Sequence, residues 1–120
     1  MDIVANVLVV VVAVLHLLFA VLQAFLWQGP RARALSGFDA GTARATAPLA
    51  ANQGLYNAFV AAGLLWGLLR VAERGHAVLV FFLAFVVIAG VVGGLTARRT
   101  ILLTQALPGA VALTAVLSAH

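Results

Sequence analysis

The chain has 120 residues, of which 65% are hydrophobic and 8% are charged, whereas about 25% of the residues in an ordinary soluble domain are charged. It contains no cysteine, which excludes disulfides, thiolate chemistry and cysteine-bound metal sites. Its net charge of +4 comes from arginines that stand singly or in pairs between apolar runs, a pattern typical of loops at a membrane surface rather than of nucleic-acid binding.

Four apolar runs are long enough to cross a bilayer, which takes about 20 residues in a helix. They cover about residues 3–27, 49–69, 76–96 and 101–117. The first run is longer than the apolar core of a signal peptide, and no arginine precedes it. We therefore expect it to be a retained membrane span.

The connections between these runs indicate the topology. The first, residues 28–48, mixes glycine, proline, serine and arginine, so we expect a loop without a fifth span. Leu35 and Phe38 would let a short stretch of this loop lie on the membrane interface. The other two connections are tight turns, which make neighbouring helices antiparallel. The sequence thus predicts an all-α fold, an integral membrane four-helix up-down bundle that forms one domain over residues 1–120.

The distribution of arginines predicts the orientation, because cytoplasmic loops are enriched in basic residues. The first and third loops hold Arg31, Arg33, Arg44, Arg98 and Arg99, and the second loop holds Arg70 and Arg74. We expect loops one and three in the cytoplasm and both chain ends outside.

Two pairs of glycines, each four residues apart, lie in the second and third spans. They are Gly63 with Gly67 and Gly90 with Gly94. Such spacing favours close packing of helices in a membrane over a space left for a ligand.

Polar side chains gather on two spans. On the first span, the polar side chains and two alanines fall in a stripe about 80° wide, given 3.6 residues per helical turn. Those of the second are two pairs four residues apart, which places them on a shared face. The stripe contains Ala13, His16, Ala20, Gln23 and Trp27, and the second set contains Asn52, Gln53, Tyr56 and Asn57.

Both sets belong to the half of the bundle near loops one and three, together with Thr96, Thr104 and Gln105. His16 would lie about 16 Å deeper than Trp27, at 1.5 Å per residue, and form the floor of this cluster. Two interpretations compete: polar contacts that hold helices together, or a pocket open to the cytoplasmic face. The number of polar groups favours the pocket.

The segments "AANQGLYNAFVAAGLLWG" and "GVVGGLTARRTILLTQALPGAVAL", with His16 and the "FLW" at 25–27, resemble a family of small four-span bacterial membrane proteins. This family is domain of unknown function number 1304, and the resemblance covers nearly the whole chain apart from loop one. It implies a multi-pass protein of the bacterial inner membrane, without an established activity. The family's "EH" and "EMFLW" correspond to Leu15-His16 and to a stretch beginning at Gln23, so two carboxylates are absent here.

The sequence predicts that this pocket binds a small, partly apolar molecule. Its predicted lining is Gln23, Trp27, Asn52, Gln53, Tyr56, Asn57 and Gln105. The lipid bilayer is the expected partner, and no nucleic acid is expected. Association with a second copy of the chain remains open. No metal site or cofactor is expected, because His16 is the only histidine deep within a span.

Two other functions remain open. One is an intramembrane isomerase, cyclase, lyase or hydrolase that acts on a lipophilic substrate, with His16 as acid or base and Tyr56 as its catalytic partner. The other is a dimeric exporter or pore. A proton-coupled exporter is disfavoured because no carboxylate lies within a span.

Overall fold

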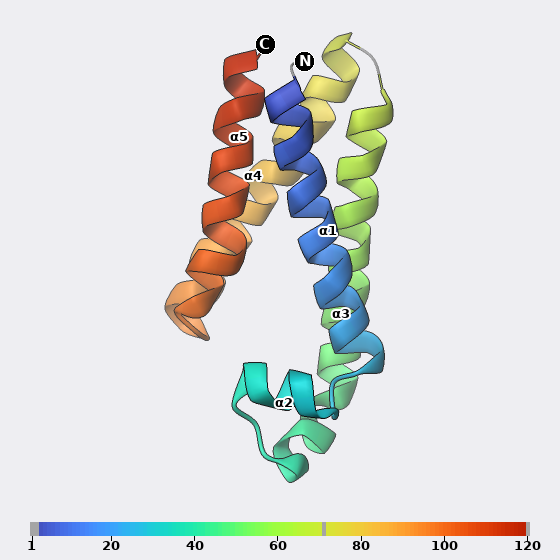
Figure 1. The fold of residues 1–120 in the computed structure, drawn as a ribbon, viewed down its shortest axis with the longest axis vertical. Coiled ribbons are helices and arrows are strands. Elements are labelled where there is room, and N and C mark those ends of the chain that lie inside the picture. The colour runs from blue at the N-terminus through green and yellow to red at the C-terminus, as the bar shows by residue number, and fades with distance from the viewer. Residues whose placement is uncertain (1–2, 71, 120) are drawn as a thin grey trace. The chain divides into compact units, whose positions relative to one another are not determined.

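The computed structural model describes the backbone of residues 3–70 and 72–119, and the side chains of residues 3–70 and 74–119. These residues form only helices, turns and short irregular stretches, which confirms the predicted all-α class (Figure 1). The helices are α1 (Ile3–Phe25), α2 (Pro30–Ser36), α3 (Ala40–Leu69), α4 (Ala72–Thr96), the π-helix η1 (Leu102–Ala106) and α5 (Leu107–Ala119).

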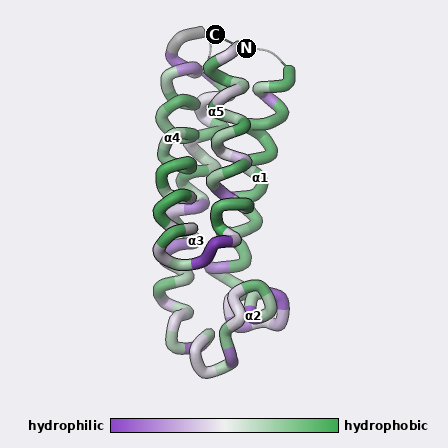
Figure 2. The backbone as a smooth tube through the Cα atoms, turned by 90° about the vertical axis from the view of Figure 1, so that its left-hand side faces the viewer, coloured by the Kyte–Doolittle hydropathy of each residue, from purple (hydrophilic) through white to green (hydrophobic). Residues whose placement is uncertain are grey.

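Three stretches of helix within the described residues are long and apolar enough to cross a membrane. They are Ile3–Phe25, Arg74–Thr96 and Leu102–Ala119. The backbone is hydrophobic over most of α1, α4 and α5 and more polar around α2 (Figure 2). α3 is not among the three, because Asn52, Gln53 and Asn57 lower the mean hydropathy of its second half. These helices are consistent with an integral membrane protein, and the four-helix bundle stays a prediction.

The first connection differs most from the prediction, because it contains helix α2 and the first residues of α3. Helix α3 begins at Ala40, whereas the sequence predicted a span from residue 49. Local signals explain α2: Pro30 stands at its first turn, and Gly37 closes it in the left-handed conformation with φ 77°. The N–H of Gly37 donates to the carbonyl of Arg33 over 2.9 Å, so α2 has the proline-start and glycine-stop arrangement common in helices.

Asp39 begins α3 as its N-cap. Its carboxylate accepts a hydrogen bond of 2.7 Å from the backbone N–H of Thr42, which otherwise has no partner in the first turn of a helix. The helix then continues through Pro48, although this residue cannot donate to the carbonyl of Arg44. Composition favoured a loop here, but the cap and the tertiary structure maintain a helix.

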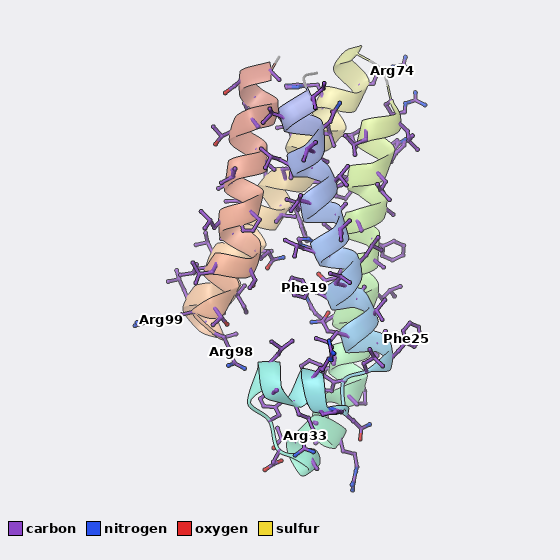
Figure 3. The ribbon with its side chains drawn as sticks, in the orientation of Figure 1. Phe19, Phe25, Arg33, Arg74, Arg98 and Arg99 are labelled. Atoms are coloured by element: carbon purple, nitrogen blue, oxygen red, sulfur yellow. The ribbon has the colours of Figure 1, made fainter. Side chains whose placement is uncertain are left out.

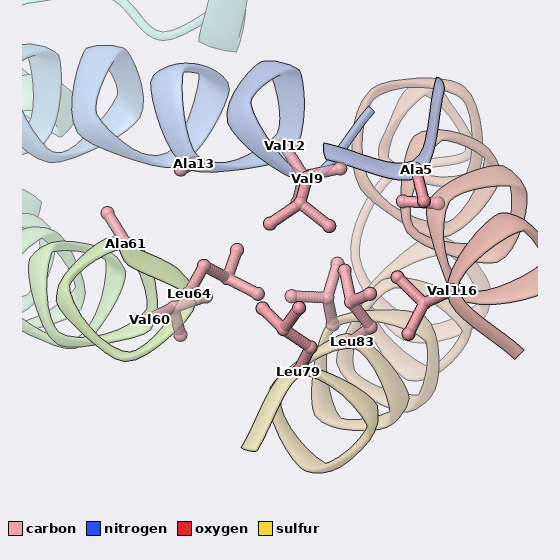
Figure 4. Packing of buried hydrophobic residues seen from close by; sticks show 12 residues of the cluster. Ala5, Val9, Val12, Ala13, Val60, Ala61, Leu64, Leu79, Leu83 and Val116 are labelled. Carbon is pink, nitrogen blue, oxygen red and sulfur yellow. The ribbon is translucent and has the colours of Figure 1, made fainter. Parts of the chain in front are cut away.

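The structure divides into two compact units, and the division falls within α1 and α3. The first unit is Met1–Val14 with Val60–His120, and the second unit is Leu15–Phe59. In the first unit, side chains from α1, α3, α4 and α5 form one apolar core (Figure 4). The buried members are Ala5, Val9, Val12, Ala13, Val60, Ala61, Leu64, Leu79, Leu83, Val86, Ala112 and Val116.

The glycine pairs of the first unit lie at helix contacts, which confirms the close-packing interpretation. A Cβ atom built on Gly63 would collide with the ring of Phe82, and one on Gly67 would lie 2.6 Å from a methyl group of Leu79. Gly90 meets backbone instead of a side chain, because its Cβ would lie 2.5 Å from the amide nitrogen of Ala106. Helix α4 therefore packs directly on the backbone of η1.

The π-helix η1 precedes a proline, and the two features are related. The N–H of Leu107 donates to the carbonyl of Leu102, five residues earlier. Pro108 has no N–H for the carbonyl of Thr104, so the regular α-helical hydrogen bond is absent at this point. A π-turn accommodates one extra residue within a helix and is found mostly as a single turn of this kind.

We expect Gly90→Ala to destabilise the first unit by about 1–3 kcal/mol, because the added methyl group collides with backbone that cannot rotate away. Gly93→Ala is the matched control on the same helix, because its nearest contact would be the side chain of Ile101 at 3.2 Å. Both variants gain the same helix propensity, so the difference between them measures the collision. Unfolding measurements in detergent should show a clearly larger loss of stability for Gly90→Ala than for Gly93→Ala. Equal losses of stability in the two variants would contradict the packing described.

We also expect the carboxyl of Asp39 to titrate below its ordinary pKa. The Thr42 N–H lowers this pKa most, and the Thr42 hydroxyl and the charge of Arg33 lower it further. The pKa of Asp39 is lower in the folded state than in the unfolded state. The cap therefore stabilises α3 fully at pH values above the unfolded pKa, and this stabilisation is lost as the pH falls through the folded pKa. An NMR titration of the Thr42 amide should have its midpoint below the ordinary pKa of an aspartate.

Asp39→Asn is the control for this titration, because asparagine caps a helix as well as aspartate and does not ionise. The Thr42 amide of this variant should keep its hydrogen-bonded shift without an acid transition. A wild-type midpoint at or above the ordinary aspartate value would contradict the cap.

Candidate functional site

The polar run "NQGLYN" lies in the second unit, where α3 packs against α1. The residues of α3 that are buried in this unit include Ala43, Ala50 and Gly54, which have small side chains or none. A Cβ atom on Gly54 would lie 2.9 Å from the carbonyl oxygen of Ala20 and 3.2 Å from the amide nitrogen of Ala24. The backbones of α1 and α3 thus touch at Gly54, and the glycine within the polar run has a packing role.

Asn57 and Gln23 form a hydrogen bond between these two helices. The side-chain amide of Asn57 donates from Nδ2 to Oε1 of Gln23 over 2.6 Å. Asn57 is 7% exposed and Gln23 is half-buried, so the bond lies mostly out of contact with solvent or lipid. It lies one helical turn from the backbone contact at Gly54. For these two predicted pocket residues, the structure favours the interpretation as polar contacts that hold helices together.

The other members of the run are exposed. Asn52, Gln53 and Tyr56 all lie on the surface of the second unit, and Tyr56 is 56% exposed. The sequence predicted that these three share one face with Asn57, and the structure corrects this. Asn57 lies about 140° around the helix from Asn52 at 100° per residue, so it turns towards α1 while Asn52 does not. The run therefore has one buried side and one exposed side.

Trp27 connects the end of α1 to the start of α3. Its indole N–H donates to the hydroxyl of Thr46 over 2.9 Å, and its ring packs edge-on against Phe38 with centroids 5.9 Å apart. Thr46 in turn donates to the carbonyl of Thr42. The sequence predicted Trp27 as a pocket residue and gave no role to Thr46, since the helical start of α3 was not predicted. In the structure the polar atom of Trp27 is already bonded.

The remaining predicted residues lie apart from this run in the sequence. His16 is buried with 1% exposure, and its ring lies edge-on to Phe19 with centroids 6.2 Å apart. Burial of Ala13, His16 and Ala20 agrees with a stripe that faces the protein interior. Gln105 lies half-buried in η1, within the first unit. The hydroxyls of Thr96 and Thr104 donate to the carbonyls four residues earlier in the chain, those of Val92 and Thr100.

The polar atoms available to a ligand are those on the exposed side. Among the described residues, no buried side-chain nitrogen or oxygen lacks a hydrogen-bond partner. The same part of the chain contains no group of three or more histidines and carboxylates that could hold a metal ion. Asn52, Gln53 and Tyr56 are different, because none of them has a hydrogen-bond partner within the described residues.

We expect the Asn57–Gln23 bond to stabilise the second unit, and a double-mutant cycle measures its strength. Asn57→Ala, Gln23→Ala and the double variant should give a coupling of about 0.6–1.7 kcal/mol, the range for hydrogen bonds between membrane helices. Thr114→Val is the control, because its hydroxyl bonds only to the carbonyl of Ala110 in its own helix. If the losses of stability in the two single alanine variants add up to the loss in the double variant, the hydrogen bond contributes nothing to stability.

The comparisons with known proteins agree with the resemblance found in the sequence. No curated protein and no solved structure matches the chain. A family described as "Protein of unknown function (DUF1304)" matches residues 10–117, which include most of α1, all of α3 with the polar run, and the π-helix. The chain belongs to this family of proteins of unknown function, DUF1304.

Proposed function

We propose that this protein spans the inner membrane as a four-helix up-down bundle and binds a small, partly apolar molecule at the exposed side of the polar run. The observation that carries the proposal is the exposure of Asn52, Gln53 and Tyr56 without a hydrogen-bond partner in the described residues. An amide without a partner in hydrocarbon costs several kcal/mol. Such groups are retained where they meet a polar atom of another molecule or water.

The surroundings of these groups indicate the chemistry of the ligand. Leu55 and Phe59 are 53% and 61% exposed on the same part of α3. Small-molecule sites combine apolar and aromatic surface with a few polar groups that fix the ligand's orientation. A molecule with an apolar body and a carbonyl or hydroxyl group fits this combination. The two amides can donate and accept, and the phenol of Tyr56 can donate to an oxygen.

The second half of α3 supports its proposed assignment as a membrane span, in addition to the three helices that are long and apolar enough to cross a membrane. Leu65, Trp66 and Leu69 are exposed there, as lipid-facing side chains of a span would be. The arginines support the proposed orientation: Arg74 lies at the start of α4, and Arg98 and Arg99 follow its end (Figure 3). With loops one and three in the cytoplasm, the polar run lies in the cytoplasmic half of the bundle.

The surroundings of His16 do not favour an enzymatic function over a structural role for this residue. Its imidazole is 1% exposed and packs beside Phe19, which is also how a histidine with a structural role is placed. Catalysis by His16 stays a prediction from the sequence, and so does a dimeric exporter or pore.

Native mass spectrometry of the protein released from mild detergent tests the binding proposal. Wild-type protein should carry a co-purified small molecule that organic extraction recovers. The double variant Asn52→Leu/Tyr56→Phe should retain at least about tenfold less of it, because it loses hydrogen bonds that are each worth about 1 kcal/mol. Leu65→Ala is the control, since it changes an exposed side chain of the same helix outside the polar run and removes no polar group.

Two results would contradict the proposal. One is wild-type protein that carries no small molecule from any preparation. The other is equal occupancy of the wild type and the double variant, which would show that the exposed amide and phenol do not contact the ligand.

A further inference from the structure

A second surface lies at the end of α1, around α2 and the first turns of α3. The second unit has three arginines, Arg31, Arg33 and Arg44, and one carboxylate, Asp39. Arg33 is half-buried: its Nε donates to the carbonyl of Phe38, and its charge acts on Asp39. Arg31 and Arg44 are exposed, and neither has an ion-pair or hydrogen-bond partner within the described residues. Two guanidinium groups are thus available to an external anion.

Large apolar side chains are exposed on the same segment. Phe25 projects from the end of α1 (Figure 3) and is 81% exposed, and Leu26 is 54% exposed. Leu35 on α2 is 66% exposed, and Leu49 on α3 is 73% exposed. A partner for this surface must therefore offer apolar groups together with negative charge.

Helix α2 is held in place although it is too short to be stable alone. Isolated helices shorter than about 12 residues are marginal in water, and α2 has 7 residues. The ring contact between Trp27 and Phe38 and the bond from Arg33 to Phe38 fix the chain on both sides of Gly37. The side chains of Arg31 and Leu35 are four residues apart, so they project from neighbouring points on this fixed helix.

We infer that residues 25–49 form a docking surface for anionic lipid headgroups of the membrane. Arg31 and Arg44 bind the lipid phosphates, and Leu35 with its apolar neighbours enters the boundary between headgroups and acyl chains. The segment starts where the membrane helix α1 ends, so the lipid surface adjoins it without a separate partner. Arginine suits this role because its planar group binds phosphate through two parallel hydrogen bonds. This inference does not depend on the proposed ligand of the polar run.

Quenching of Trp27 by brominated lipids tests this inference. The full chain carries Trp66→Phe, which leaves Trp27 as the only tryptophan, and is reconstituted in phosphatidylcholine vesicles. One set of vesicles contains a minor fraction of brominated phosphatidylglycerol, and the other the same fraction of brominated phosphatidylcholine. We expect stronger quenching by the anionic lipid, and a smaller difference at high salt, because salt screens exposed charges.

Variants assign the preference to the two arginines. Arg31→Gln/Arg44→Gln should lower the relative binding constant for the anionic lipid by about fivefold for each charge removed. Arg31→Lys/Arg44→Lys should keep most of the preference for the anionic lipid, because the charge remains. Arg70→Gln, which removes an exposed arginine after the other end of α3, should leave it unchanged. Circular dichroism confirms that each variant is folded.

Three results would overturn the inference. The first is equal quenching by the two lipids in the wild-type background. The second is an equal loss in Arg70→Gln and Arg31→Gln/Arg44→Gln, which would show a general effect of net charge. The third is complete loss of the preference when inorganic phosphate is added at constant ionic strength, which would assign the arginines to a soluble anion instead of a lipid.

Discussion

Direct contact between helix backbones is the constraint on which the rest of this structure depends. Hydrophobicity does not drive helices together in lipid, so close packing and polar contacts must do so. In the second unit, α1 and α3 touch at Gly54, where a methyl group would lie 2.9 Å from a carbonyl oxygen. In the first unit, α4 meets the backbone of η1 at Gly90 in the same manner.

The polar run has a side that packs against α1 and a side that is exposed. Gly54 and Asn57 face α1, where the glycine allows approach and the amide donates to Gln23. Asn52 and Tyr56 lie on the exposed side of the same turns. Asn52 and Tyr56 take no part in this helix contact, and they belong to the surface proposed to bind a ligand.

The helical class and most of the buried stripe were predictable from the sequence, because they depend on residue type and period alone. Long apolar runs gave α1, α4 and α5, and the 3.6-residue period placed Ala13, His16 and Ala20 inside. Helix α2 and the early start of α3 were not predicted, since composition favoured a loop. The local signals were present in Pro30, Gly37 and Asp39, and a search for helix caps would have found them. The 140° between Asn52 and Asn57 follows from the helical period, but which of these two sides faces Gln23 depends on the packing of two helices.

The π-helix η1 has a consequence for the rotational phase of α5. A π-turn holds one residue more than an α-turn, and each residue turns an α-helix by about 100°. Ala112 and Val116 follow this extra residue, and both are fully buried in the core of the first unit. A continuous α-helix with the same number of residues would turn both side chains by up to about 100° around the helix axis and out of that core. The π-turn, by absorbing one residue, therefore determines which face of α5 is buried.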